Sequence, residues 1–106
     1  MIASRALDRQ KPLMKKLDNS QKRQLIAKAH SLKPVVMLGA KGLTEAVLAE
    51  IDQALEHHEL IKIKIPGSEK AERIEVAENI ATQAKAEFLR LIGQVAIFYR
   101  KSKPIR

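Results

Sequence analysis

The apolar positions of this chain fall into stretches with helical spacing, separated by shorter stretches typical of strands. The first helical stretch follows Asn19 or Ser20, either of which can cap a helix, and runs to about His30. Lys28 lies at the flank of its apolar side, where the methylenes can cover the core while the charge reaches water. The apolar residues that share this side are Leu25, Ile26, Ala29 and Leu32.

A continuous apolar run over residues 34–38 predicts a short strand covered on both faces of its sheet. The loop 39–42 joins this strand to a second helical stretch, which Thr44 can cap. Leu43 and Leu48 have the spacing of a hydrophobic staple at its start. The apolar stripe of the second helix comprises Val47, Leu48, Ile51, Ala54 and Leu55.

Residues 60–65 predict a strand, because the last five alternate with period two and place Lys62 and Lys64 on one face. Ser68 can cap a third helix, which extends to about Ala84. The residues expected on the packing side of this helix are Ile74, Ala77, Ile80, Ala81 and Ala84.

Residues 88–92 and 95–100 are two further predicted strands, and Gly93-Gln94 between them suits a type II′ hairpin turn. The order α-β-α-β-α-β-β, with helices linking successive strands, implies partly parallel pairing. The fold class is therefore α/β, and 106 residues suffice for a single compact domain. The expected divisions are a flexible basic N-terminal arm (1–18), the domain (19–100) and a basic C-terminal tail (101–106).

The chain has a formal net charge of +8, and its positive charge is concentrated in the first two-fifths of the sequence. Residues 1–41 contain ten Lys and Arg against two Asp, whereas residues 42–100 contain seven against ten acids. Residues 101–106 add three further basic residues. A one-sided basic field attracts polyanions, so nucleic acid is the first partner to consider and an acidic membrane the second.

The residues that catalysis requires do not form a recognisable constellation. The sequence has no cysteine, which excludes disulfides, thiolate metal sites and a cysteine nucleophile. His57 and His58 are adjacent and diverge on a helix, so they lack the spacing of a metal-binding pair. We expect no enzymatic activity, no metal, no cofactor and no small-molecule substrate.

Three aromatic residues, Phe88, Phe98 and Tyr99, are too few for a base-stacking platform, although Tyr99 can face outward. The charged N-terminus does not match a secretory signal, and no apolar run reaches the ~20 residues of a membrane span. The expected location is the cytoplasm.

The loop 39–42 is the best candidate binding element. It links a strand to the start of a helix, where free amides and the helix dipole favour an anion. Its glycines allow close approach of a phosphate backbone, as in the GxxG loop of KH domains, although two such glycines often mean only a tight turn. The predicted RNA-binding residues are Lys22, Arg23, Lys28, Lys33, Gly39, Ala40, Lys41, Gly42 and Thr44.

Several separated motifs resemble the stand-alone bacterial CRM-domain proteins, the YhbY family. They are found at residues 29–39, 42–45, 55–62, 92–93 and 98–100. The resemblance implies a mixed four-stranded sheet similar to the C-terminal domain of bacterial translation initiation factor three. It also implies RNA binding through the GxxG loop and association with precursors of the large ribosomal subunit (pre-50S particles). Lys41 stands where the family usually has Asn or Gly, which should strengthen phosphate attraction.

These observations predict an RNA-binding protein of ribosome biogenesis whose partner is ribosomal RNA. Two alternatives remain open. One is a module that binds double-stranded DNA. The other is a protein-interaction adaptor that uses the acidic residues of the second helix, Glu45, Asp52 and Glu56.

Overall fold

The computed structural model describes residues 17–101 and has the predicted order of elements. Most of the predicted arm and tail therefore lies outside the described residues. The elements are α2 (Asn19–Ala29), β1 (Val36–Met37), α3 (Glu45–His58), β2 (Leu60–Lys64), α4 (Lys70–Ala84), β3 (Glu87–Ile92) and β4 (Val95–Tyr99). In this part of the chain, no helix is long and apolar enough to cross a membrane.

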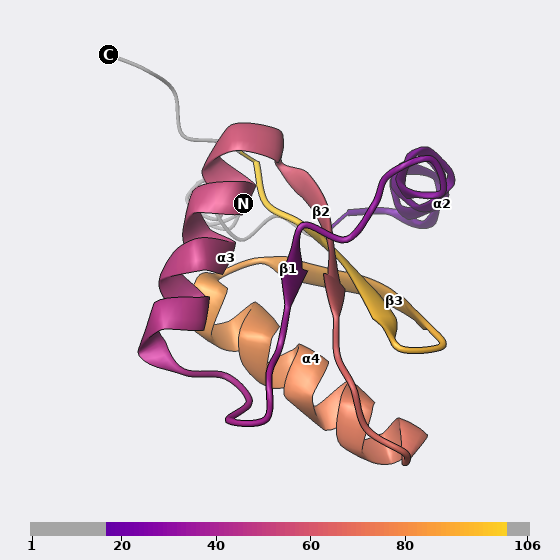
Figure 1. Ribbon diagram of the computed structural model, residues 1–106. Coiled ribbons are helices and arrows are strands. Elements are labelled where there is room, and N and C mark those ends of the chain that lie inside the picture. Colours follow the sequence, from indigo (N-terminus) through magenta and orange to yellow (C-terminus); the bar gives the residue numbers. More distant parts are fainter. Residues whose placement is uncertain (1–16, 102–106) are drawn as a thin grey trace, which may run out of the picture.

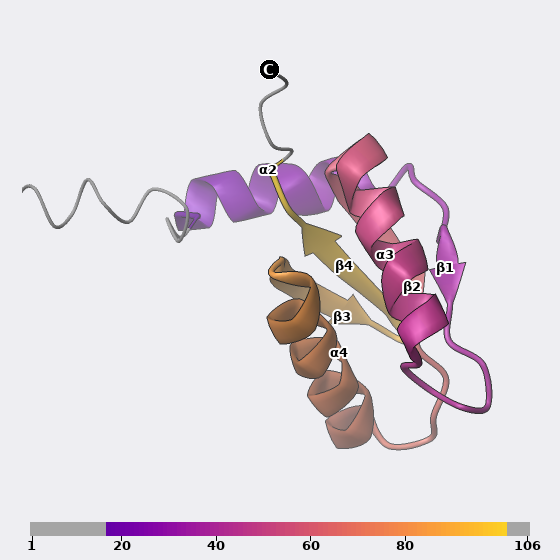
Figure 2. The same ribbon diagram turned by 90° about the vertical axis from the view of Figure 1, so that its left-hand side faces the viewer.

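The four strands form one mixed sheet in the order β1-β2-β4-β3. β1 and β2 are parallel, whereas β4 is antiparallel to both of its neighbours. Figure 2 shows α3 and α4 in front of this sheet and α2 behind it. The predicted α/β class, the mixed four-stranded sheet and the partly parallel pairing are confirmed.

The main core lies between the sheet and the pair α3 and α4. Ile51 and Leu55 of α3 and Ile80 of α4 pack there against alternate strand residues such as Ile63 and Phe98, and all five are fully buried. Their spacing follows the predicted apolar stripes, which is why the helix faces were predictable from the sequence. A smaller cluster of Ile26, Ala29 and Ile97 holds α2 on the opposite face.

The prediction that the strand at residues 34–38 is covered on both faces is wrong. β1 is an edge strand, and its side chains alternate between the main core and the side that carries α2. Val36 and Leu38 are buried, but Val35 is 49% exposed and Met37 is 64% exposed. The physical reason is that α2 packs on β2, β3 and β4 and leaves this part of β1 uncovered.

Helix caps were predicted with mixed success. Thr44 caps α3 as expected, accepting a hydrogen bond from the Val47 N–H at 3.2 Å. The cap of α2 is Asp18 rather than Asn19 or Ser20, because Gln21 completes a capping box with it.

The beginning of α4 also differs from the prediction. Its N-cap is Glu69 rather than Ser68, and no side chain forms the cap hydrogen bond. The first helical bond is donated by the Arg73 N–H to the Glu69 carbonyl at 3.1 Å, so the helix begins one residue later. At the final hairpin, Gly93 has φ +60° and Ile92 pairs with Val95, as the predicted type II′ turn requires.

Candidate nucleic-acid interface

The glycine loop is a tight turn that leaves its two central residues at the surface. The Gly42 N–H donates a hydrogen bond to the Gly39 carbonyl at 3.0 Å, and Gly42 has φ +73°, a region that favours glycine. Ala40 and Lys41 form the exposed tip. Among residues 17–101, no atom other than those of Gly39 and its chain neighbours lies within 4 Å of the position that a Cβ at Gly39 would occupy. An extended polyanion can therefore reach this backbone without a steric barrier.

The loop lies directly before the N-terminus of α3, where helix amides attract anions. One of these amides, the Val47 N–H, already donates a hydrogen bond to the Thr44 hydroxyl oxygen. Glu45 adds a negatively charged carboxylate in the first turn. Lys41 is therefore the group that gives the loop its positive charge, while the remaining first-turn amides add a partial charge.

The predicted basic residues of α2 lie at the other end of β1 from the loop (Figure 1). Six residue steps separate Lys33 from Gly39, and in extended chain they span up to about 20 Å. Lys28 and Lys33 both line one hollow at the end of α2. The structure thus divides the predicted residues into two groups, one at the loop and one at α2.

Two lysines outside the predicted site lie between these groups. Lys62 and Lys64 of β2 are on the face of the sheet that carries α2. Lys64 pairs with Met37, two residues before the loop, and the Lys62 Nζ donates to the Leu32 carbonyl at 3.0 Å. Period-two alternation already placed both lysines on one face, but only the parallel register with β1 puts them between the loop and α2.

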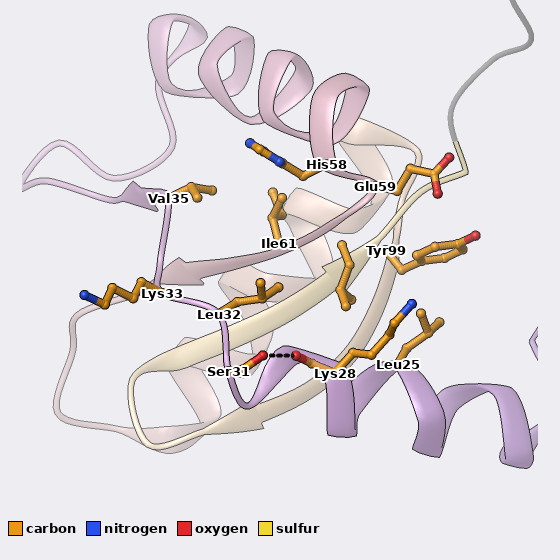
Figure 3. Close-up of a pocket in the computed structure, with 11 residues that line it drawn as sticks. Leu25, Lys28, Ser31, Leu32, Lys33, Val35, His58, Glu59, Ile61 and Tyr99 are labelled. Carbon is orange, nitrogen blue, oxygen red and sulfur yellow. Dashed lines mark hydrogen bonds between the residues drawn. The ribbon is translucent and has the colours of Figure 1, made fainter.

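A groove follows the boundary between α2 and the first residues of β2. Its volume is about 580 Å³, and its lining includes Leu25, Lys28 and Lys33 on one side and Leu60 and Tyr99 on the other. Figure 3 shows the Tyr99 ring beside Leu25 and the amino end of Lys28. Leu25, Lys28 and Tyr99 also line a second hollow on the other part of α2.

Tyr99 is the aromatic residue of this groove. Partial burial raises the pKa of its phenol above the ordinary value, and the nearby Glu59 carboxylate raises that pKa further. The side chain therefore presents a neutral phenol at physiological pH, which can stack and can donate a hydrogen bond.

Part of the acidic surface of α3 is neutralised within the domain. Arg100 pairs with the Asp52 carboxylate at 2.8 Å and with the Glu56 carboxylate at 3.0 Å. The Arg100 guanidinium also donates to the Ala84 carbonyl at 2.8 Å, which connects α3, α4 and the end of β4. The Asp52 and Glu56 carboxylates thus have a structural role. This leaves less free negative charge on α3 for the binding of a protein partner, as the adaptor alternative requires.

The chain belongs to the CRS1 / YhbY (CRM) domain family, whose sequence profile matches residues 17–100. It is 46% identical over 90 residues to a protein of Haemophilus influenzae named "RNA-binding protein", covering 85% of this chain and 91% of that protein. It is 40% identical over 86 residues to Probable RNA-binding protein PA4753 of Pseudomonas aeruginosa, covering 81% and 83% of the two chains.

A solved structure has the same fold. The solution structure of the hypothetical protein SAV1595 from Staphylococcus aureus superimposes with a TM-score of 0.75 at 32% sequence identity. The match covers 86% of this chain and 95% of that one. The family resemblance expected from the sequence motifs is confirmed.

Proposed function

We propose that this protein binds RNA as a non-enzymatic module and contacts phosphates along one cationic strip. The strip begins at Lys41 in the loop, continues through Lys64 and Lys62 on β2, and ends at Lys33 and Lys28. The observation that carries the proposal is the parallel register of β1 and β2, because it puts Lys62 and Lys64 between the loop and the lysines at the end of α2. The RNA-binding names of the relatives support the choice of RNA over DNA.

Binding through such a strip is governed by the release of counterions from RNA phosphates. If ~4–6 phosphates are neutralised, log K against log salt should have a slope of about −3 to −5. Replacing Lys62 and Lys64 together by Ala should make that slope shallower by about 1.5, because two phosphate contacts are lost.

The loop is tested by the double substitution Ala40→Asp with Lys41→Asp. Gly39 and Gly42 remain, so the turn is retained, and acids before a helix are compatible with its dipole. Affinity for a structured RNA should fall at least about tenfold, because two carboxylates would face the phosphates. Filter binding at fixed salt measures the affinity.

The matched control is Gln83→Glu with Lys85→Glu, which makes the same change in net charge at the end of α4. These residues are exposed and lie outside the strip, so affinity should remain close to wild type. A loop variant that melts like wild type and binds equally well would exclude the loop as a phosphate contact. Tighter binding to a DNA duplex than to the RNA duplex of the same sequence would favour the DNA alternative.

The proposed RNA is ribosomal RNA in precursors of the large subunit, bound in the cytoplasm. The similarity to the stand-alone bacterial CRM-domain proteins supports this assignment. Sedimentation of a lysate through a sucrose gradient at low salt tests it. The protein should migrate with large-subunit precursors and leave those fractions after RNase treatment, whereas an RNase-resistant complex would favour the adaptor.

A further inference from the structure

The groove between α2 and β2 has features that a purely electrostatic contact with phosphates does not need. Leu25 of α2 and Leu60 of β2 give it an apolar lining, and Tyr99 adds an aromatic ring. The groove is open to solvent, and its volume of about 580 Å³ leaves room for a nucleobase. A rigid duplex presents phosphates and sugars to a protein surface and would leave this lining uncovered.

Positive charge lies at both ends of the groove. In Figure 3, the amino groups of Lys28 and Lys33 extend in different directions, with the apolar lining between their stems. Both side chains are exposed, and neither forms an ion pair within residues 17–101. Lys28 therefore places a cation beside Tyr99 and Leu25, and Lys33 places a second cation at the far end of the apolar lining.

The backbone at the rim of the groove is held in an uncommon conformation. Glu59, between α3 and β2, has φ +62° and ψ −42°, which a residue with a side chain adopts at a cost of about 1–3 kcal/mol. Hydrogen bonds from Glu59 N–H to the Leu55 carbonyl and from Arg100 N–H to the Glu59 carbonyl, both at 2.9 Å, hold it there. The turn sets the start of β2, and thus places Leu60 opposite Tyr99.

We propose that this groove binds a single unpaired nucleotide of the RNA, with its base against Tyr99 and Leu25 and a flanking phosphate at Lys28, while Lys33 contacts the RNA backbone further along. The proposal rests on the proposed RNA-binding function and gives that function a preference for RNA with a bulged or looped-out nucleotide. Stacking of a base on an exposed aromatic ring tolerates any base, so the preference should concern pairing rather than sequence.

The test compares two RNA hairpins with the same stem and loop, of which one carries a single bulged adenosine and the other is fully paired. Wild-type protein should bind the bulged hairpin about tenfold more tightly, which corresponds to the stacking of one base. Tyr99→Leu should reduce this preference to twofold or less, because it retains apolar packing but removes the ring. Tyr99→Phe should retain the preference.

Two further variants separate the groove from general electrostatics. Lys28→Ala, on an exposed position of a helix, should weaken binding of the bulged hairpin more than binding of the paired one. Lys85→Asn removes one charge outside the groove, at a left-handed position that Asn tolerates, and should leave the preference unchanged. Thermal melting of each variant establishes that it is folded.

The outcomes distinguish this proposal from RNA binding itself. Equal affinity of wild-type protein for the two hairpins, or an undiminished preference in both Tyr99→Leu and Lys28→Ala, would overturn the groove assignment and leave RNA binding intact. Absence of binding to either hairpin would overturn RNA binding and the groove proposal together.

Discussion

The two faces of the sheet are built from alternate residues of the same strands but are covered very differently. On one face, α3 and α4 enclose a cluster of twelve buried residues. On the other, α2 alone covers a cluster of three. The exposed large apolar side chains of the described residues all lie on this second side, and they are Leu32, Val35, Met37 and Ile92.

This difference separates stability from binding. The face under α3 and α4 contributes most of the buried apolar area, and thus most of the hydrophobic stabilisation. The α2 side retains accessible apolar residues beside Lys62 and Lys64, and exposed apolar patches with polar surroundings often mark binding sites. Alternate residues of the same strands therefore stabilise the core on one face and remain accessible for binding on the other, depending on which helices cover each face.

The largest expected difference between the faces is in the free energy of unfolding. Phe98→Ala should lower it by about 3–5 kcal/mol, because the fully buried ring leaves a cavity in the main core. Met37→Ala should change it by less than about 0.5 kcal/mol, because that side chain is 64% exposed. Urea denaturation followed by circular dichroism measures both. If Phe98→Ala does not fold, Phe98→Leu is a milder substitution at the same site. Comparable losses of unfolding free energy at Phe98 and Met37 would contradict the difference in coverage between the two faces.

A second prediction concerns the attachment of α2. Asp18→Ala should lower the stability of this helix by about 1 kcal/mol, because the Gln21 N–H loses its 2.7 Å hydrogen bond to the Asp18 carboxylate. Hydrogen exchange should become faster in α2 and remain unchanged in α3 and α4, since the three-residue cluster holds α2 separately.

Ser20→Ala is the matched control for the cap. Ser20 is exposed and lies within α2 rather than at its cap, so its replacement should leave exchange nearly unchanged. Equal effects of the two substitutions would mean that the capping box does not stabilise the helix.

The smallest effect concerns the phenol of Tyr99. Burial, and secondarily the Glu59 carboxylate, raise its pKa above the ordinary value of about 10. Since Tyr99 is the only tyrosine of the chain, absorbance at 295 nm should report its titration alone, with a midpoint above that of the urea-unfolded protein. The folded state favours the neutral phenol, so this contribution to stability is fully present below pH 10 and is lost as the pH rises through the folded pKa.

Glu59→Gln should lower the midpoint of this titration without abolishing the shift, because burial is the larger cause. A midpoint equal to that of the unfolded chain would show that Tyr99 does not pack in the groove. It would thereby contradict the difference in burial between the half-buried Tyr99 and the exposed Val35 and Met37 of the same side.

The amino-acid sequence by itself determined the local features of this protein. The helix stripes, the Thr44 cap and the Gly93 hairpin depend on residues a few positions apart, so their side-chain spacing and backbone preferences suffice. The Asp18 cap was also encoded locally, since Gln21 three residues later completes its capping box, but the prediction placed the cap at Asn19 or Ser20.

Only the tertiary structure decided how these pieces are placed relative to one another. The insertion of β4 between β2 and β3, the exposure of β1 and the separation of the loop from α2 all follow from strand order. The groove depends on Lys28 and Tyr99, which are far apart in the chain and meet because α2 packs on the end of the β2–β4 pair. Hydrophobic periodicity specifies which side of an element is buried, but it does not specify the partner, and the partner determines which charges share a surface.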